Sequence, residues 1–213
     1  MLEKIVTMYR KAEMGFVNAL SGATEKVIEE THFYDTGYML TQISRIQKEL
    51  KRIEGELKTS LEIQDNSDYG KNHVSELMGQ REKLLFHLIF LASNSFGNLD
   101  DCVKIADGHN FVFMQCVQGL WEYRAGHKDK AFKLIEAYYR EHGSVEQHLL
   151  VNKVFGLMLA EKGMQQKAVP FLTYALQFIP NDTECLNCLR MCYQKDNETD
   201  REAVISEILA VLD

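Results

Sequence analysis

Apolar residues recur every three or four positions over most of the chain, which is the spacing of one face of an α-helix. In two stretches the steps alternate between four and three, with charged and amide residues in between, as in a heptad repeat. The first stretch has Met39, Ile43, Ile46, Leu50, Ile53 and Leu57, and the second has Val74, Leu77, Arg81, Leu84, Leu88 and Leu91. We therefore expect two long helices, each with one seam.

A short polar segment, residues 65–72, separates the two heptad patterns. Two patterned helices joined by such a turn are predicted to fold back as an antiparallel coiled-coil hairpin within one chain. The alternative is a homodimer in which one seam pairs with a second copy. A further helical face runs from Leu2 to Ala19, so residues 1–93 are predicted to be a helical coiled-coil region.

The second half of the chain has shorter helical segments with glycines between them, and it contains an internal repeat. Residues 117–143 align with residues 154–180 without a gap. The matching pairs are Gly119 with Gly156, Gly126 with Gly163, and Ala131 with Ala168, always 37 residues apart. Small residues at matching places in two segments indicate one packing scheme used twice.

The second copy resembles a tetratricopeptide repeat, whose pattern of aromatic, small and proline residues has fixed spacing. The matching residues are Asn152, Phe155, Gly156, Leu159, Ala168, Leu172, Ala175 and Pro180. The family's first large aromatic residue is replaced here by Asn152, and its later phenylalanine by Leu172. The resemblance covers about residues 84–213, with Gly163 expected in the turn inside one unit and residues 182–212 as a closing unit.

This resemblance implies an all-α chain in which residues 94–213 form a short superhelix of helix-turn-helix units with a concave groove. The groove positions carried over from the family are Phe113, Cys116, Leu120, Tyr123, Leu150, Lys153, Leu157, Asn187 and Met191. Only Lys153 fits the family version that binds a carboxylate, so an acidic tail is not the expected partner. A mostly apolar groove suits an amphipathic helix or an extended apolar segment of another protein. The alternative is that another helix of the same chain fills it.

Composition narrows the classes of partner. Apolar residues make up 46% and charged residues 26% of the chain, and the formal net charge is −7. Without a dense basic patch, nucleic acid is not an expected partner. No apolar run is long enough to span a membrane, and the charged first residues do not resemble a secretory signal. The five cysteines are an odd number, so we expect reduced thiols and a cytoplasmic location.

Two motifs could bind a metal, and each has a simpler interpretation. Cys185, Cys188 and Cys192 lie on one helical face, but zinc needs a fourth ligand, and small apolar thiols suit a tight helix contact. Residues 65–76 match part of a calcium loop, although Tyr69 stands where an oxygen ligand is needed. The seven histidines are dispersed and no phosphate-binding glycine loop is present. We therefore predict no metal, no cofactor and no catalytic residue.

The function expected from this pattern is non-catalytic protein binding, as an adaptor, an assembly factor or a chaperone. A secretion-type chaperone is one specific form of it. Two alternatives stay open: an architectural subunit of a larger complex, and a regulatory or enzymatic helical protein whose site the sequence does not reveal. The step from fold to function depends on the family resemblance alone.

Overall fold

The chain is all-α, as the spacing of its apolar residues predicts. The computed structural model describes residues 36–63, 67–143 and 148–212, and these form nine α-helices, one 3-10 helix and no strand. The elements are α3 (Thr36–Ile63), α4 (Asp68–Ala92), η2 (Phe96–Asn98), α5 (Leu99–Ile105), α6 (Met114–Arg124), α7 (Lys128–His142), α8 (Leu149–Glu161), α9 (Gln165–Phe178), α10 (Thr183–Lys195) and α11 (Thr199–Leu212).

Each helix packs mainly against its neighbours in sequence, which is compatible with a helical repeat fold. In the part of the chain that the structure describes, no helix combines the length and the apolar content needed to cross a bilayer. The predicted helical face from Leu2 to Ala19 lies outside the described residues.

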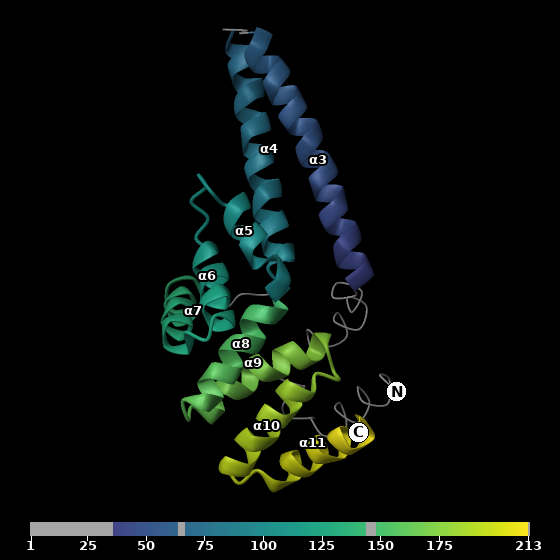
Figure 1. Cartoon of the computed structure of the whole chain (residues 1–213), viewed down its shortest axis with the longest axis vertical. Coiled ribbons are helices and arrows are strands. Elements are labelled where there is room, and N and C mark those ends of the chain that lie inside the picture. The colour runs from purple at the N-terminus through teal and green to yellow at the C-terminus, as the bar shows by residue number, and fades with distance from the viewer. Residues whose placement is uncertain (1–35, 64–66, 144–147, 213) are drawn as a thin grey trace.

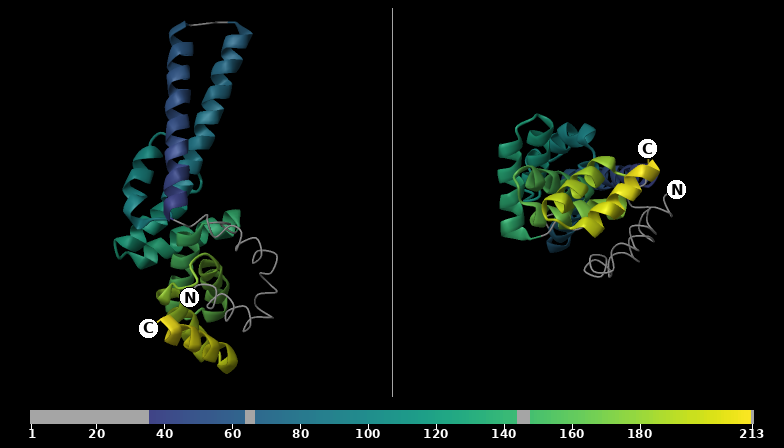
Figure 2. Two further views of the ribbon diagram at one scale, coloured as in Figure 1. Left: turned by 90° about the vertical axis from the view of Figure 1, so that its right-hand side faces the viewer. Right: turned by 90° about the horizontal axis from the view of Figure 1, so that it is seen from below.

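Helices α3 and α4 form an arm that projects from the rest of the molecule (Figures 1 and 2). They lie side by side and run in opposite directions. The predicted seams face inward, since Leu50, Ile53 and Leu57 of α3 and Leu77 and Leu88 of α4 are buried. The seam is therefore covered within one chain, and a dimer formed through it would first have to separate α3 from α4.

The root of the arm is joined to the start of α8 by a buried polar contact. Ser93 Oγ lies 2.9 Å from His148 Nε2, and the Val151 N–H donates to His148 Nδ1 at 3.2 Å. Because Nδ1 accepts, the imidazole proton is on Nε2 and is donated to Ser93. The rings of Phe90 and Phe113 lie 5.0 and 5.1 Å from the imidazole. Burial lowers the pKa of His148 to about 3, so the ring is neutral and caps α8.

Small residues allow close approach of the paired helices, as the internal repeat predicts. A methyl group added at Gly119 in α6 would lie 2.5 Å from Ile135 Cγ1 in α7. One added at Gly156 in α8 would lie 3.0 Å from Leu172 Cγ in α9. The two matching alanines are fully buried: Ala131 and Ala168. The contact between α6 and α7 is thus repeated between α8 and α9, with each residue 37 positions further along the chain.

A third copy of the turn is present where the sequence shows no glycine. Gly126, Gly163 and Asn197 have positive φ values of 85°, 77° and 58°. In all three turns the next residue donates its N–H to the carbonyl five positions earlier at 2.9 Å. This is the Schellman arrangement, and asparagine is the other residue that adopts it readily. The closing unit, α10 with α11, therefore turns in the same way as the two before it.

Replacing Asn197 with alanine should lower the free energy of unfolding by about 1 kcal/mol, because alanine tolerates a left-handed backbone less well than asparagine. Asn197→Gly should be neutral or slightly stabilising at the same position. Urea unfolding followed by circular dichroism measures both effects. Gly163→Ala, at the equivalent turn of the preceding unit, is the matched control and should also destabilise. Equal stability of the alanine and glycine variants at position 197 would contradict the assigned turn.

Pro170 lies near the start of α9, close to the place that the sequence predicts. The proline was expected in or just after the first turn, with the helix starting near Gln166 or Lys167. Helix α9 begins at Gln165, one or two residues earlier, so Pro170 is its sixth residue and lies in the second turn. Its missing N–H leaves the Gln166 carbonyl without its helical partner. Both residues are exposed, so water can satisfy that carbonyl.

Candidate functional site

The nine residues expected to line a groove fall into a buried set and an accessible set. The buried ones are Phe113, Cys116, Leu120, Leu150 and Leu157. Tyr123 and Lys153 are half-buried, and Asn187 and Met191 are exposed. Helix α4 helps to bury Phe113, since the centre of the Phe90 ring lies 5.0 Å from that of Phe113. Just after α4, Asn94 Oδ1 accepts from the Leu150 N–H. Four expected residues therefore reach the surface.

These four residues belong to a surface that crosses three helix pairs: α6 with α7, α8 with α9, and α10 with α11. It runs from α6 and the start of α7 over α8 to α10, and we call it the inter-unit strip. Its members are Tyr123, Lys128, Lys153, Glu161, Glu184, Asn187 and Met191. The pairing of its charged side chains was not predicted, since each pair joins residues some thirty positions apart in sequence.

Lys153 ties α8 to α10. Its Nζ lies 2.7 Å from Asp182 Oδ2 and 2.8 Å from Glu184 Oε2. The other Asp182 oxygen accepts from the Cys185 N–H at 3.0 Å and so caps α10. Burial lowers the pKa of Lys153, but the hydrogen bonds to the two carboxylates outweigh burial and hold its pKa above the ordinary value. The ammonium group is therefore charged and fixed in place.

The Tyr123 phenol lies among the charged groups of three helices. Burial raises its pKa, the carboxylate of Glu184 adds to the rise, and Lys128 opposes it. The Lys128 ammonium also lies 5.9 Å from the centre of the tyrosine ring and 2.6 Å from Glu161 Oε1. The Tyr123 ring thus lies near two lysines, Lys128 and Lys153, each of which is ion-paired with a carboxylate.

The rest of the strip is one face of α10. Glu184, Asn187 and Met191 are spaced by three and four residues, which places them in one row along the helix. The Asn187 amide donates to the Thr183 carbonyl at 2.8 Å and accepts from Arg190 at 3.1 Å, so it is held at both ends. Met191 is 51% exposed, so an apolar side chain lies at the surface beside these fixed polar groups.

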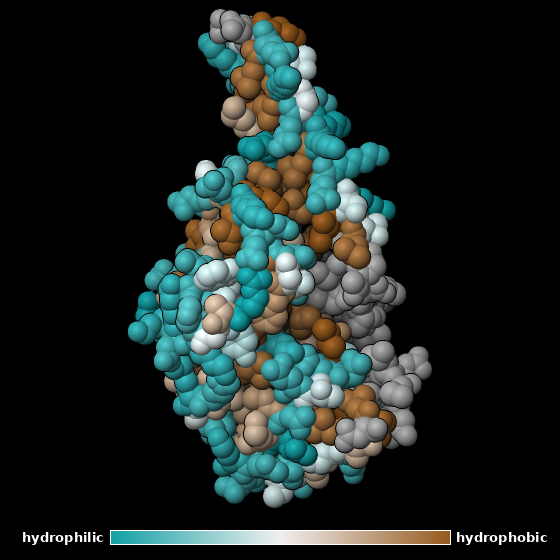
Figure 3. All heavy atoms as spheres, viewed as in Figure 1, coloured by the Kyte–Doolittle hydropathy of each residue, from teal (hydrophilic) through white to brown (hydrophobic). Residues whose placement is uncertain are grey.

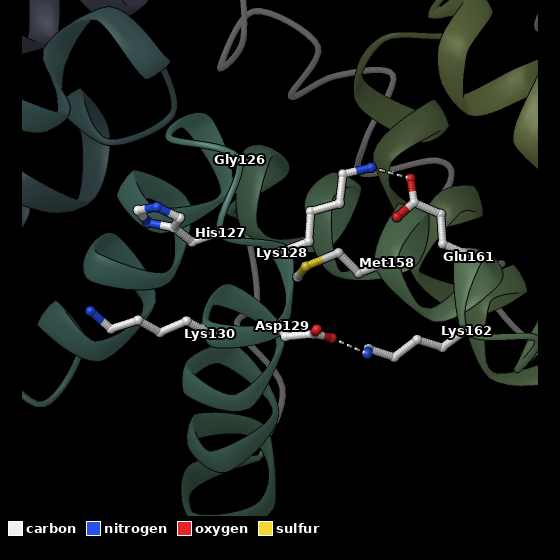
Figure 4. A pocket seen from close by; sticks show the side chains of 8 residues that line it. All are labelled: Gly126, His127, Lys128, Asp129, Lys130, Met158, Glu161 and Lys162. Carbon is white, nitrogen blue, oxygen red and sulfur yellow. Dashed lines mark hydrogen bonds and ion pairs between the residues drawn. The ribbon is translucent and has the colours of Figure 1, made fainter.

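A cleft of about 830 Å³ borders the strip, where the turn between α6 and α7 meets the end of α8 (Figure 4). Its lining residues are Gly126, His127, Lys128, Asp129, Lys130, Met158, Glu161 and Lys162. Two ion pairs cross it, Lys128 with Glu161 at 2.6 Å and Lys162 with Asp129 at 2.7 Å. Figure 4 shows the two pairs side by side, each joining one unit to the next.

The remaining cation of the cleft is also paired. Glu122 is 3% exposed and lies 2.5 Å from Lys130 Nζ and 2.8 Å from His127 Nδ1. The hydrogen bond from Lys130, and then that from His127, hold the pKa of the Glu122 carboxyl below its usual range. Each lysine and carboxylate of the cleft therefore has an opposite charge beside it, so the cleft fastens consecutive units and offers little unpaired charge to a ligand.

The cysteines of α10 are packing residues, as the simpler interpretation predicts. Cys185, Cys188 and Cys192 are buried in the main core. Burial raises the pKa of the Cys185 thiol above its usual value, whereas the hydrogen bond with Cys188 lowers that of Cys192. Over residues 36–63, 67–143 and 148–212, no three His, Cys, Asp or Glu side chains are grouped so that they could hold a metal ion.

The partial calcium loop lies only partly in the described chain, since its first residue, Asp65, falls outside it. Ser67 Oγ accepts from the Gly70 N–H at 3.1 Å and so caps α4. The exposed Glu76 carboxylate accepts from Gln80 at 3.3 Å. These contacts give both residues an ordinary helical role.

No protein-family model matches the chain, and neither the curated proteins nor the solved structures include a match.

Proposed function

We propose that this chain is a non-catalytic protein-binding module: a tetratricopeptide-like superhelix behind a coiled-coil arm, with the inter-unit strip as the surface that holds the partner. The observation that carries the proposal is that side chains of three successive units meet on this strip already oriented by their ion pairs. A surface ordered before binding loses less entropy when the partner arrives. Met191, half exposed at one end, offers the apolar contact that protein interfaces need.

The repeated packing supports the family part of the proposal. Gly119 and Gly156 make the same close contact, and three turns share one backbone geometry. Stacked units of this kind leave one face of their first helices open to ligands. The five apolar residues expected there lie in the core, so the partner meets a shallower and more polar surface. An adaptor, an assembly factor or a chaperone fits such a surface, and a secretion-type chaperone is one form of it.

A second candidate is an architectural subunit, and the arm favours it. Leu61, Ile63 and Tyr69 are 54%, 69% and 79% exposed at the free end of the arm. Figure 3 shows apolar side chains at this end of the arm, as well as along the arm and at its root. A subunit of a larger assembly would use this tip as a contact.

The test is co-purification of a partner with the full tagged chain from its native cells. Met191→Glu should lose a stoichiometric partner, at least tenfold, because a charge replaces the apolar contact. Met78→Glu is the matched control, since Met78 is also 51% exposed but lies on the arm. Circular dichroism should show the same helical content in both variants and the wild type.

Retention of the partner by Met191→Glu would contradict the strip as the binding surface. Loss of the partner from Ile63→Glu, with Met191→Glu unaffected, would instead identify the architectural role.

A further inference from the structure

We infer that the outer face of α3 joins two copies of this chain into an antiparallel dimer, with the tip of each arm on the root of the other. The inference concerns the arm and does not depend on the inter-unit strip. It differs from a dimer through the heptad seam, because that seam is buried between α3 and α4 of one chain. It is carried by the charges along the arm, by the cations at its root and by exposed apolar side chains at both ends.

The arm is divided into a basic half and an acidic half. Its root half, residues 36–53 with residues 80–92, contains six basic and two acidic side chains. Its tip half, residues 54–79, contains two basic and six acidic side chains. Two arms that lie antiparallel bring each basic half beside an acidic half, whereas parallel arms would place like charges together. The charge pattern therefore favours a second copy of the arm in the antiparallel direction.

The cations of the root are accessible. Arg45 and Lys48 are exposed, and neither forms an ion pair with a described residue. Glu49, the carboxylate nearest to them on α3, is held by Arg52 at 2.6 Å. The root therefore keeps positive charge that its own carboxylates do not neutralise, in a chain whose net charge is −7.

The carboxylates of the tip half are only weakly held. Glu62 lies 3.9 Å from Lys58, and both side chains are more than half exposed. Glu54 lies 3.5 Å from Arg81 and is also exposed. Exposed pairs of this length contribute little, so both carboxylates remain available to the cations of a second copy.

Apolar side chains are exposed at both ends of the same helix. Leu40 is 57% exposed at the root, where it borders a shallow hollow that also adjoins Arg45 and Lys48. Leu61 and Ile63 are exposed at the tip. Three heptads separate Leu40 from Leu61, so the two leucines lie on one stripe of α3. Antiparallel pairing covers both stripe ends, because the tip leucine of each copy meets the root leucine of the other.

The outer face of α3 is open to a second helix. Among the described helices, α4 is the main neighbour of α3, and Figure 1 shows α5 beside α4 on the side away from α3. Near the middle of α3, a carbon added at Gly55 would meet no atom within 4 Å. A helix of another copy can therefore approach along the length of the arm.

A twofold axis at Lys51 gives the register. It places Leu40 of one copy next to Leu61 of the other, and Lys48 next to Glu54. The two Lys51 side chains meet at the axis, within one helical turn of Glu54 of the opposite copy. The contact then extends over about 32 Å at 1.5 Å per residue. A contact one helix wide is smaller than a standard interface, so a micromolar dissociation constant and a strong salt dependence are expected.

Two charge-reversed variants of the full chain test the inference. One is Arg45→Glu with Lys48→Glu at the root, and the other is Glu54→Lys with Glu62→Lys toward the tip. Analytical ultracentrifugation of the purified chain at low ionic strength should give a wild-type mass of about twice 24.6 kDa. Each variant alone should associate at least about tenfold more weakly, because like charges then meet at both contacts. An equal mixture of the two variants should dimerise again, since opposite charges then meet at both contacts.

Lys133→Glu with Lys167→Glu is the matched control, because it changes the net charge equally at exposed positions of α7 and α9. It should dimerise like the wild type, and circular dichroism should show equal helical content in all variants. A monomeric wild type at submillimolar concentration, a control as weakly associated as the arm variants, or no dimer in the mixture would each overturn the inference. The proposed function has a separate readout, the loss of the native partner from Met191→Glu, so either can fail while the other stands.

Discussion

Replacing Gly119 with valine should destabilise the fold by about 3 kcal/mol or more, which for a chain of this size is a fall of roughly 10 °C in Tm. The first added carbon would lie 2.5 Å from Ile135 Cγ1, well inside contact distance. Ile135 is fully buried and β-branched, so its Cγ1 has no free space to move into. Helices α6 and α7 would have to separate, and the core beneath them would lose packing.

Gly79→Val is the control for this variant. Gly79 also lies inside a helix, α4, but a carbon added there meets no atom within 4 Å. It should be neutral or slightly stabilising, because valine has a higher helix propensity than glycine. Urea unfolding followed by circular dichroism compares the two. The double variant Gly119→Val with Ile135→Ala should lose less stability than the two single variants together. Equal stability of Gly119→Val and Gly79→Val would contradict the close approach of α6 and α7.

Acid should destabilise the chain through His148, by about 1.4 kcal/mol for each pH unit below about 6.5. The folded pKa of about 3 lies below that of an unfolded histidine. The unfolded chain therefore takes up this proton first, and stability that is complete above pH 6.5 is lost as the pH falls toward 3. Protonation would also end the acceptor role of Nδ1, which caps α8.

Two variants separate this titration from that of other groups. His148→Asn keeps a capping side chain but cannot be protonated, so the difference in stability from the wild type should shrink as the pH falls. Ser93→Ala loses the contact to Nε2, at a cost of about 1 kcal/mol, but retains His148 and the full acid dependence. Free energies of unfolding from pH 7 to pH 4 give the measurement. A constant difference between wild type and His148→Asn over this range would refute the assignment.

The fold could be predicted from the sequence where one local pattern decides the structure. Leu50, Ile53 and Leu57 repeat at heptad spacing, and a helix can bury them in only one way. Gly119 and Gly156 were recognised because a repeat aligned them. Asn197 was missed because asparagine marks a left-handed turn less often than glycine, and only its position 34 residues after Gly163 indicates the role.

The site was less predictable, because it depends on how units stack. Lys153 was selected as a groove residue, but its partners Asp182 and Glu184 belong to the next unit. Leu150 was placed in the groove by family position alone. Its backbone N–H donates to Asn94, two residues after α4, a contact across 56 residues that no local pattern contains. Family position identifies the helix and its general face, and the tertiary contacts decide which side chains remain accessible.

The arm has a mechanical consequence. Helix α3 has 28 residues and is about 42 Å long, so a rotation of about 5° at its root moves the tip by about 4 Å. The buried contact of Ser93 with His148 lies at the root, and His148 caps α8, the helix that carries Lys153. A displacement of the arm at its root would therefore bear on the first turn of α8, through the contacts of His148 with Ser93 and with the Val151 N–H.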